Sequence, residues 1–226
     1  MYPSVLTEAE TLRQVLAGAS LARYGDGEFN LCEGHSIPCQ QHSPELERRL
    51  RGILTHSGGC LVGIPNLDSA TPKAQFWHKY QRVAPLLGAQ TYGSAFISRP
   101  DSAPWIDVPE YWAAIEALWA GLDVTVVRGN LSPKGLRRSD MESAKSVREI
   151  LCPRRDAFAD YADILAAIGT EEDHVLLCLG PTATVLAVDL CQHGIHAVDC
   201  GHIALFWRKH LRGEPMIVTD ADKAAE

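Results

Sequence analysis

The sequence lacks the features that mark membrane-spanning, secreted and nucleic-acid-binding proteins. No uninterrupted apolar run reaches the roughly 18 residues of a membrane-spanning helix. Residues 1–10 (MYPSVLTEAE) contain neither the basic segment nor the apolar segment of a secretory signal. Lys and Arg number 21 against 28 Asp and Glu, which gives a net charge of −7 and argues against general binding of nucleic acid. We therefore expect no transmembrane segment, no nucleic-acid partner and a cytoplasmic location.

Diagnostic cysteine and catalytic motifs are also missing. The seven cysteines are odd in number and form no C-x-x-C pair, so reduced thiols are expected and a structural zinc site is disfavoured. No G-x-G-x-x-G, Walker A, H-E-x-x-H or G-x-S-x-G motif occurs. The chemistry must therefore be sought in less specific groups of residues.

Composition and pattern predict a single α/β domain over residues 1–215, followed by a polar tail, 216–226. Apolar residues make up 46% of the chain, enough for a sizeable core. The predicted strands are 21–24, 60–64, 92–98, 123–127, 174–179 and 196–199. The predicted helices are 7–18, 43–54, 71–87, 109–120, 139–150, 160–168, 181–194 and 202–213. This alternation predicts a Rossmann-like, mostly parallel sheet with helices on both faces.

Ligands of such sheets bind at the carboxyl ends of the strands. The first predicted strand runs into Arg23-Tyr-Gly-Asp-Gly-Glu28. If the chain is extended there, Asp26 and Glu28 point to the same side, and Gly25 and Gly27 allow a tight turn or close approach to a ligand. Two carboxylates on one side suit Mg²⁺ or Mn²⁺, although a plain polar turn explains the same residues.

Residues 128–138 form a polar, basic loop after another predicted strand. Its cations are Arg128, Lys134, Arg137 and Arg138, and Lys145 follows on the next predicted helix. Such a patch suits phosphates, and Asn130 and Ser132 add groups that could read a base or ribose. The alternative is a solvated charged loop.

Two further strand ends carry candidate groups. Gly180-Pro181-Thr182 opens a helix, whose free N–H groups could bind an anion, or it is simply a tight turn with Pro in the first turn. Asp199 and His202 could form an acid–base pair or contact a diphosphate. The alternative for His202 is an ordinary structural histidine.

Aromatic residues concentrate around the predicted helix 109–120. Trp105, Tyr111, Trp112 and Trp119 could stack on sugar, but aromatic residues on a helix more often belong to the core. Trp112 and Trp119 are seven residues apart and share one face, which would also suit the seam of a homodimer.

Taken together, the ordered segments resemble the GT-D fold family of small bacterial glycosyltransferases. They are Arg23–Glu28, Gly63-Ile-Pro65, Ser94-Ala-Phe-Ile-Ser-Arg-Pro100, Ala144–Pro153 with Asp156-Ala-Phe158, Leu179–Leu186 and Asp199-Cys-Gly-His202. The resemblance implies a Rossmann-like fold, a UDP-glucose-like donor, and a divalent metal with the diphosphate at Asp26 and Glu28. The chain departs from the family in the 128–138 loop and at Asp156, where the family has Asn.

The expected activity is metal-dependent transfer of a glucose-like sugar from a nucleotide-sugar to a hydroxyl of a glycan, a lipid-linked sugar or a glycoprotein. A lipid-linked acceptor would place the protein at the inner face of the membrane. Asp199 and His202 are the candidate bases, and the cations expected to stabilise the leaving nucleotide are Arg23, Lys134, Arg137 and Lys145. The alternatives are a non-catalytic nucleotide-sugar-binding module, a methyltransferase and a phosphohydrolase.

Overall fold

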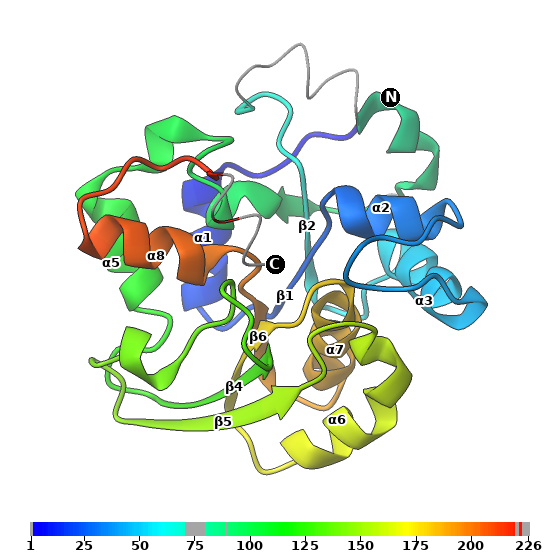
Figure 1. The fold of residues 1–226 in the computed structure, drawn as a ribbon. Coiled ribbons are helices and arrows are strands. Elements are labelled where there is room, and N and C mark those ends of the chain that lie inside the picture. The colour runs from blue at the N-terminus through cyan, green and yellow to red at the C-terminus, as the bar shows by residue number, and fades with distance from the viewer. Residues whose placement is uncertain (1, 71–79, 89, 220–221, 223–226) are drawn as a thin grey trace.

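The computed structural model describes residues 2–70, 80–88, 90–219 and 222. Seven strands form one sheet in the order β3-β2-β1-β7-β6-β4-β5, and every neighbouring pair is parallel. The strands are β1 (Leu21–Arg23), β2 (Leu61–Ile64), β3 (Tyr92–Ser94), β4 (Asp123–Gly129), β5 (Ser146–Cys152), β6 (His174–Cys178) and β7 (His196–Asp199) (Figure 1). The predicted α/β class with a parallel sheet is confirmed.

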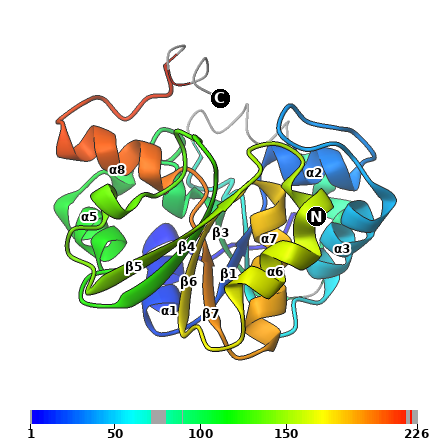
Figure 2. The same ribbon diagram turned by 60° about the horizontal axis from the view of Figure 1, so that its bottom comes forward.

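Helices cover both faces of this sheet. Those described are α1 (Glu8–Leu16), α2 (Asp26–Cys32), α3 (Pro44–Thr55), α5 (Pro109–Glu116), α6 (Tyr161–Ile168), α7 (Pro181–Gln192) and α8 (Ile203–Leu211). Figure 2 shows α1, α5 and α8 on one side of the sheet and α3, α6 and α7 on the other. Shorter 3₁₀ segments are Gln81–Leu86, Ala95–Ser98, Pro104–Ile106, Arg138–Asp140 and Ala157–Asp160.

Each face of the sheet has its own apolar core, which explains the continuous apolar strands. In β6, Val175 and Leu177 pack into the core beneath α7, and Leu176 packs into the core beneath α1, α5 and α8. The predicted helix start at Thr7 is confirmed, because Thr7 Oγ1 accepts from the Glu10 N–H (3.2 Å) and Glu10 Oε2 accepts from the Thr7 N–H (2.9 Å).

Two predicted elements are wrong. Residues 139–150 do not form a helix, since Ser146–Cys152 is the edge strand β5, paired along its whole length with β4. Asp140 instead caps the backbone N–H of Arg137 (2.8 Å) in a short 3₁₀ turn. The strand predicted at 92–98 stops at Ser94, because Ser94 Oγ accepts from the Phe96 N–H (3.1 Å) and the chain turns into 3₁₀ helix.

The helix predicted at 71–87 lies largely outside the described residues. Positions 71–79 are not described, and Gln81–Leu86 is a 3₁₀ helix. Among the described residues, no helix combines the length and apolarity needed to cross a bilayer.

The aromatic residues of α5 belong to the core rather than to a dimer seam. Tyr111, Trp112 and Trp119 are buried, whereas Trp105 is exposed. Trp207 of α8 packs against both indoles, with ring centroids 6.1 Å from Trp112 and 5.3 Å from Trp119. The face that the two tryptophans share is therefore covered by α8 of the same chain.

Candidate functional site

The strand order makes the carboxyl ends of β1 and β7 the expected place for a ligand crevice. From β1 the sheet runs to β2 and β3 on one side and to β7, β6, β4 and β5 on the other. Loops that leave the sheet in opposite directions create a ligand crevice at the carboxyl ends of the strands where they part. At that point lie the residues that follow β1, beginning with Arg23, and those that follow β7, beginning with Asp199.

Arg23 and Asp199 form the buried base of this crevice. The Arg23 N–H donates to Asp199 Oδ2 (3.3 Å), and the guanidinium Nη1 lies 3.8 Å from Asp199 Oδ1. Asp199 Oδ1 also accepts from the Gly201 N–H (3.0 Å). Burial raises the pKa of Asp199, and the Arg23 charge and these hydrogen bonds oppose that rise. The geometry thus favours a positioning role for Asp199, and its predicted role as a base stays a prediction.

One buried nitrogen of the Arg23 guanidinium makes no hydrogen bond among the described residues. The guanidinium Nε donates to the Ala95 carbonyl (3.2 Å), but Nη1 is buried and makes no hydrogen bond within the described part of the chain. Gly201 passes so close that a Cβ there would lie 1.5 Å from Nη1. Because buried donors are nearly always hydrogen-bonded, a guanidinium nitrogen that has only its ion pair with Asp199 retains the capacity for a further acceptor, such as an anionic ligand.

Asp26 and Glu28 begin α2 and do not share one side of an extended chain, so that prediction is wrong. On a helix, positions two apart point in different directions. Glu28 Oε2 caps the Gly25 N–H (2.8 Å), whereas Asp26 Oδ1 accepts from the hydroxyl of buried Tyr80 (2.5 Å). The strand β1 ends at Arg23, and α2 begins at Asp26 directly after its N-cap residue Gly25, so the two carboxylates lie in a helical first turn.

Glu28 faces the base of the crevice. Burial raises its pKa to about 7, the Asp199 charge adds to the rise, and the Gly25 hydrogen bond and the Arg23 charge oppose it. Glu28 therefore interacts electrostatically with Asp199 and Arg23, whereas Asp26 is hydrogen-bonded to Tyr80. The Asp199 charge is among the causes of the raised Glu28 pKa, and the Asp26 charge is not, although the sequence suggested Asp26 and Glu28 as the pair.

Three cations act on the imidazole of His202. Burial and the charges of Arg99, Lys134 and Arg23, in that order, hold the pKa of His202 well below its usual value. Arg99 is fixed by Asp101, which accepts from its Nε (2.8 Å) and Nη2 (2.7 Å). The site thus holds a neutral imidazole among positive groups, an environment suited to phosphate oxygens.

Sequence reasoning missed Tyr80 and Arg99. Tyr80 lies 54 residues from Asp26 in the chain, so only the folded structure brings them together. Arg99 had a usable signal, since Ser98-Arg99-Pro100 follows a predicted strand and strand ends line the ligand crevice.

The basic loop after β4 is anchored from α8. The Arg208 side chain donates to the carbonyls of Pro133 (2.7 Å) and Gly135 (2.8 Å) and pairs with Asp140. The Lys134 charge contributes to lowering the pKa of His202, and the Lys134 N–H donates to Ser132 Oγ (3.3 Å). Arg137 and Asn130 are exposed.

Lys145 does not lie in the site, and its predicted role is wrong. It precedes β5 at the amino ends of the strands, the edge opposite the crevice. There its Nζ pairs with Asp123 Oδ2 (2.5 Å). The error follows from the helix predicted at 139–150, since a strand in that place reverses which edge of the sheet Lys145 occupies.

The start of α7 is covered by the loop at residues 37–41. Gly180 has a φ of +55°, Pro181 occupies the first turn, and the hydroxyl of buried Thr182 donates to Gln40 Oε1 (3.5 Å). Asp156 holds the same loop, because its carboxylate accepts from the Gln41 N–H (2.5 Å). An anion-binding role for residues 180–182 stays a prediction.

Comparisons with known proteins identify the family. The model of the family described as "Glycosyltransferase GT-D fold" matches residues 21–224. The chain is 37% identical over 221 residues to the probable glycosyl transferase Gly of Streptococcus gordonii and 32% identical over 213 residues to the glycosyltransferase GlyD of Streptococcus pneumoniae serotype 4. These alignments cover 88% and 86% of this chain but only 32% and 26% of those longer proteins.

Solved structures agree with this assignment. A domain of unknown function 1792, described as having a distinct glycosyltransferase fold, superposes with a TM-score of 0.81 at 32% identity, over 93% of this chain and 82% of that one. A structure described as a new glycosyltransferase from Streptococcus sanguinis gives the same TM-score of 0.81 at 33% identity, over 93% of this chain and 85% of that one. The chain therefore belongs to the GT-D fold family of glycosyltransferases.

Proposed function

We propose that the protein transfers a glucose-like sugar from a UDP-linked donor to a hydroxyl group of a glycan or glycoconjugate. The observation that carries this proposal is the convergence of Arg23, Arg99 and Lys134 on one crevice at the carboxyl ends of the strands. In a chain of net charge −7, such a group selects an anion. The glycosyltransferase relatives support a nucleotide-sugar as that anion.

A divalent cation, Mn²⁺ or Mg²⁺, is part of the proposal, with Asp26 and Glu28 as its candidate ligands; since the two side chains leave α2 in different directions, they would reach one cation together only through a change of rotamer or a bridging water. Among the described residues, no group of three or more His, Cys, Asp or Glu side chains is arranged to hold a metal ion. Two carboxylates would therefore need the donor diphosphate and water to complete the coordination, which is common for Mg²⁺. Burial raises the pKa of Glu28 to about 7 and the Asp199 charge adds to the rise, so a cation bound beside Glu28 would favour its charged form. When bound, the cation would neutralise charge on the departing diphosphate.

The chain's own cations would share that task. Arg23 lies fixed between Asp199 and the Ala95 carbonyl, and Arg99 is held by Asp101. Such fixed charges stabilise a transition state without reorganisation, and removing one commonly costs about 3 kcal/mol of barrier. Neutral His202 can accept a hydrogen bond from the acceptor hydroxyl, which keeps it as the candidate base.

Turnover of UDP-glucose tests this function. The wild type is expected to release UDP in the presence of Mn²⁺ and to stop when the metal is chelated. Glu28→Gln and Asp26→Asn, which keep the side-chain shapes, are each expected to lower kcat at least a hundredfold. The matched control, Glu45→Gln on the exposed face of α3, is expected to behave as the wild type.

Four outcomes would contradict the proposal. Equal activity of wild type and both variants, with or without chelator, would remove the metal assignment. UDP binding without turnover across a panel of nucleotide-sugars would indicate a binding module. Thermal stabilisation by S-adenosylmethionine, but not by UDP with Mn²⁺, would indicate a methyltransferase, and release of phosphate without an acceptor would indicate a phosphohydrolase.

A further inference from the structure

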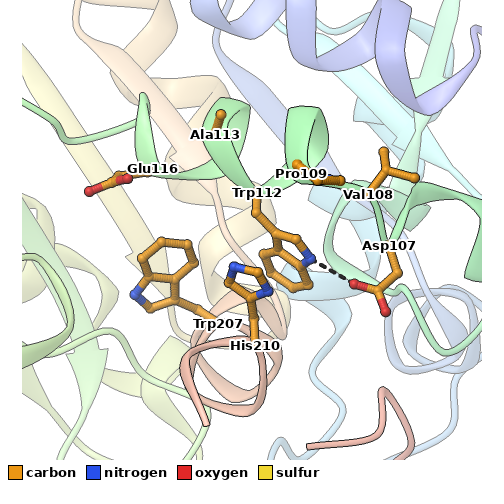
Figure 3. Close-up of a pocket in the computed structure, with 8 residues that line it drawn as sticks. All are labelled: Asp107, Val108, Pro109, Trp112, Ala113, Glu116, Trp207 and His210. Atoms are coloured by element: carbon orange, nitrogen blue, oxygen red, sulfur yellow. Dashed lines mark hydrogen bonds between the residues drawn. The ribbon is translucent and has the colours of Figure 1, made fainter. Parts of the chain in front are cut away.

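A second cavity lies between α5 and α8, outside the crevice described above. Its volume is about 340 Å³, within the range of small-molecule sites. Figure 3 shows Trp112 of α5 pointing toward α8, and Trp207 and His210 of α8 pointing toward α5. The cavity is therefore lined by aromatic rings from two facing helices.

These rings form a fixed floor. Trp112 and His210 are stacked, with ring centroids 4.4 Å apart and planes inclined by 13°. Both indole N–H groups are already used: Trp112 Nε1 donates to Asp107 Oδ1 (2.7 Å), and Trp207 Nε1 donates to the Asp140 carbonyl (2.9 Å). Both tryptophans are buried, so they line the cavity only with the edges of their rings and offer no spare donor.

Polar groups with unused hydrogen-bonding capacity surround this floor. Among the residues that the structure describes, none is hydrogen-bonded to the carboxylate of Glu116 or to the ring nitrogens of His210, and the carboxylate of Asp107 uses only Oδ1. The cavity wall contains two carboxylates and no Lys or Arg. Its charge thus disfavours a phosphate or nucleotide, and its carboxylates suit a ligand that presents several hydroxyl donors.

A neutral sugar ring matches both the aromatic lining of the cavity and its hydrogen-bond acceptors. Its C–H groups pack against aromatic rings, and its hydroxyls donate to carboxylates and to an unprotonated imidazole nitrogen. The cavity is also linked to the crevice by one rigid element. His202 immediately precedes α8, and His210 lies two turns further along, about 12 Å on the helix axis. A glycan of a few units can span that separation.

We propose that this cavity binds a neutral hexose unit of the acceptor glycan, remote from the hydroxyl that reacts. The inference rests on the proposed transferase function. It assigns to Glu116 and His210 the recognition of acceptor hydroxyls, and to Trp112 and Trp207 the apolar contact with the sugar ring.

Tryptophan fluorescence provides a direct test, because two indoles line the cavity. The full chain is titrated with neutral trisaccharides of glucose, galactose and N-acetylglucosamine. At least one is expected to bind and to change the fluorescence. The double variant Glu116→Gln/His210→Phe, which keeps a ring for the stack with Trp112, is expected to weaken that binding at least tenfold. The control Glu110→Gln, an exposed residue of α5 that does not line the cavity, is expected to bind as the wild type.

Calorimetry with UDP and hydrolysis of UDP-glucose without acceptor separate this inference from the proposed function. The double variant is expected to keep both the wild-type affinity for UDP and the wild-type rate of UDP-glucose hydrolysis. If donor hydrolysis fails in the wild type while trisaccharide binding depends on Glu116 and His210, the proposed function is wrong and the sugar site stands. If no trisaccharide binds, or if the double variant binds it equally well, the inference is wrong.

Discussion

Gly201 provides the space in which the Arg23 guanidinium lies. A Cβ at this position would be 1.5 Å from Arg23 Nη1, and the φ of +49° is itself unfavourable for other residues. We predict that Gly201→Ala displaces Arg23 and weakens binding of UDP at least tenfold, measured by calorimetry. Gly194→Ala is the matched control, because its φ of +80° imposes similar strain but nothing lies within 4 Å. Equal UDP affinity in both variants would contradict the role given to Arg23.

A histidine pair at the amino ends of β6 and β7 makes stability depend on pH. Burial, followed by the neighbouring His196, lowers the pKa of His174 from 6.5 to about 4. The unfolded chain therefore binds more protons between these values, and stability is lost as the pH falls from about 6.5 to about 4. We predict a loss of roughly 2 to 3 kcal/mol from this site.

Urea unfolding at pH 7 and pH 4.5 measures this effect. His174→Gln keeps a donor for the Leu118 carbonyl, which His174 Nε2 contacts at 2.6 Å, but does not titrate in this range. Relative to the wild type, the variant is expected to be more stable at pH 4.5 than at pH 7. A difference that does not change with pH would contradict the prediction.

The individual site residues were only partly predictable from the sequence. Arg23, Glu28, Asp199 and His202 were expected at strand ends, where the topology concentrates ligands. The contact between Tyr80 and Asp26 was not, because no local pattern encodes a hydrogen bond across 54 residues.

At the scale of the element, Asp156 has a structural role. It adopts a left-handed φ of +54°, and its carboxylate holds the loop at residues 37–41 through the Gln41 N–H. Asn tolerates this backbone and keeps the accepting oxygen. We predict that Asp156→Asn leaves the thermal midpoint and the activity nearly unchanged, whereas Asp156→Ala costs about 2 kcal/mol of stability. Equal loss in both variants, measured by urea unfolding, would contradict this role.

The error at β5 shows why element type is hard to predict at a sheet edge. Ser139-Asp-Met-Glu142 has the spacing of a capping box, and that local pattern favours a helix. The decisive interactions are non-local, since Asp140 binds Arg208 of α8 and each residue of β5 pairs with β4. Tertiary pairing overrides the local signal, and Lys145 moves to the opposite edge as a result.

At the scale of the whole molecule, the sequence predicted the architecture better than its parts. The alternation of strand and helix patterns predicts an α/β sheet, since parallel strands are usually joined by helical crossovers. They do not fix the strand order, which places β1 beside β7 although these strands lie at opposite ends of the chain. That order creates the crevice and joins Arg23 to Asp199.

The most direct test of the account is calorimetric titration of UDP, with Mn²⁺, into the wild type and Arg23→Gln. Arg13→Gln in α1 is the control for loss of an arginine outside the site. Arg23→Gln leaves the buried carboxylate of Asp199 without its ion pair, so the double variant Arg23→Gln/Asp199→Asn checks that a loss of UDP affinity is not caused by misfolding. We predict that UDP binds to the wild type and to the control with the same affinity, and at least tenfold more weakly to both Arg23 variants while they remain folded. Unchanged affinity in a folded Arg23→Gln protein would contradict the claim that this crevice holds the donor.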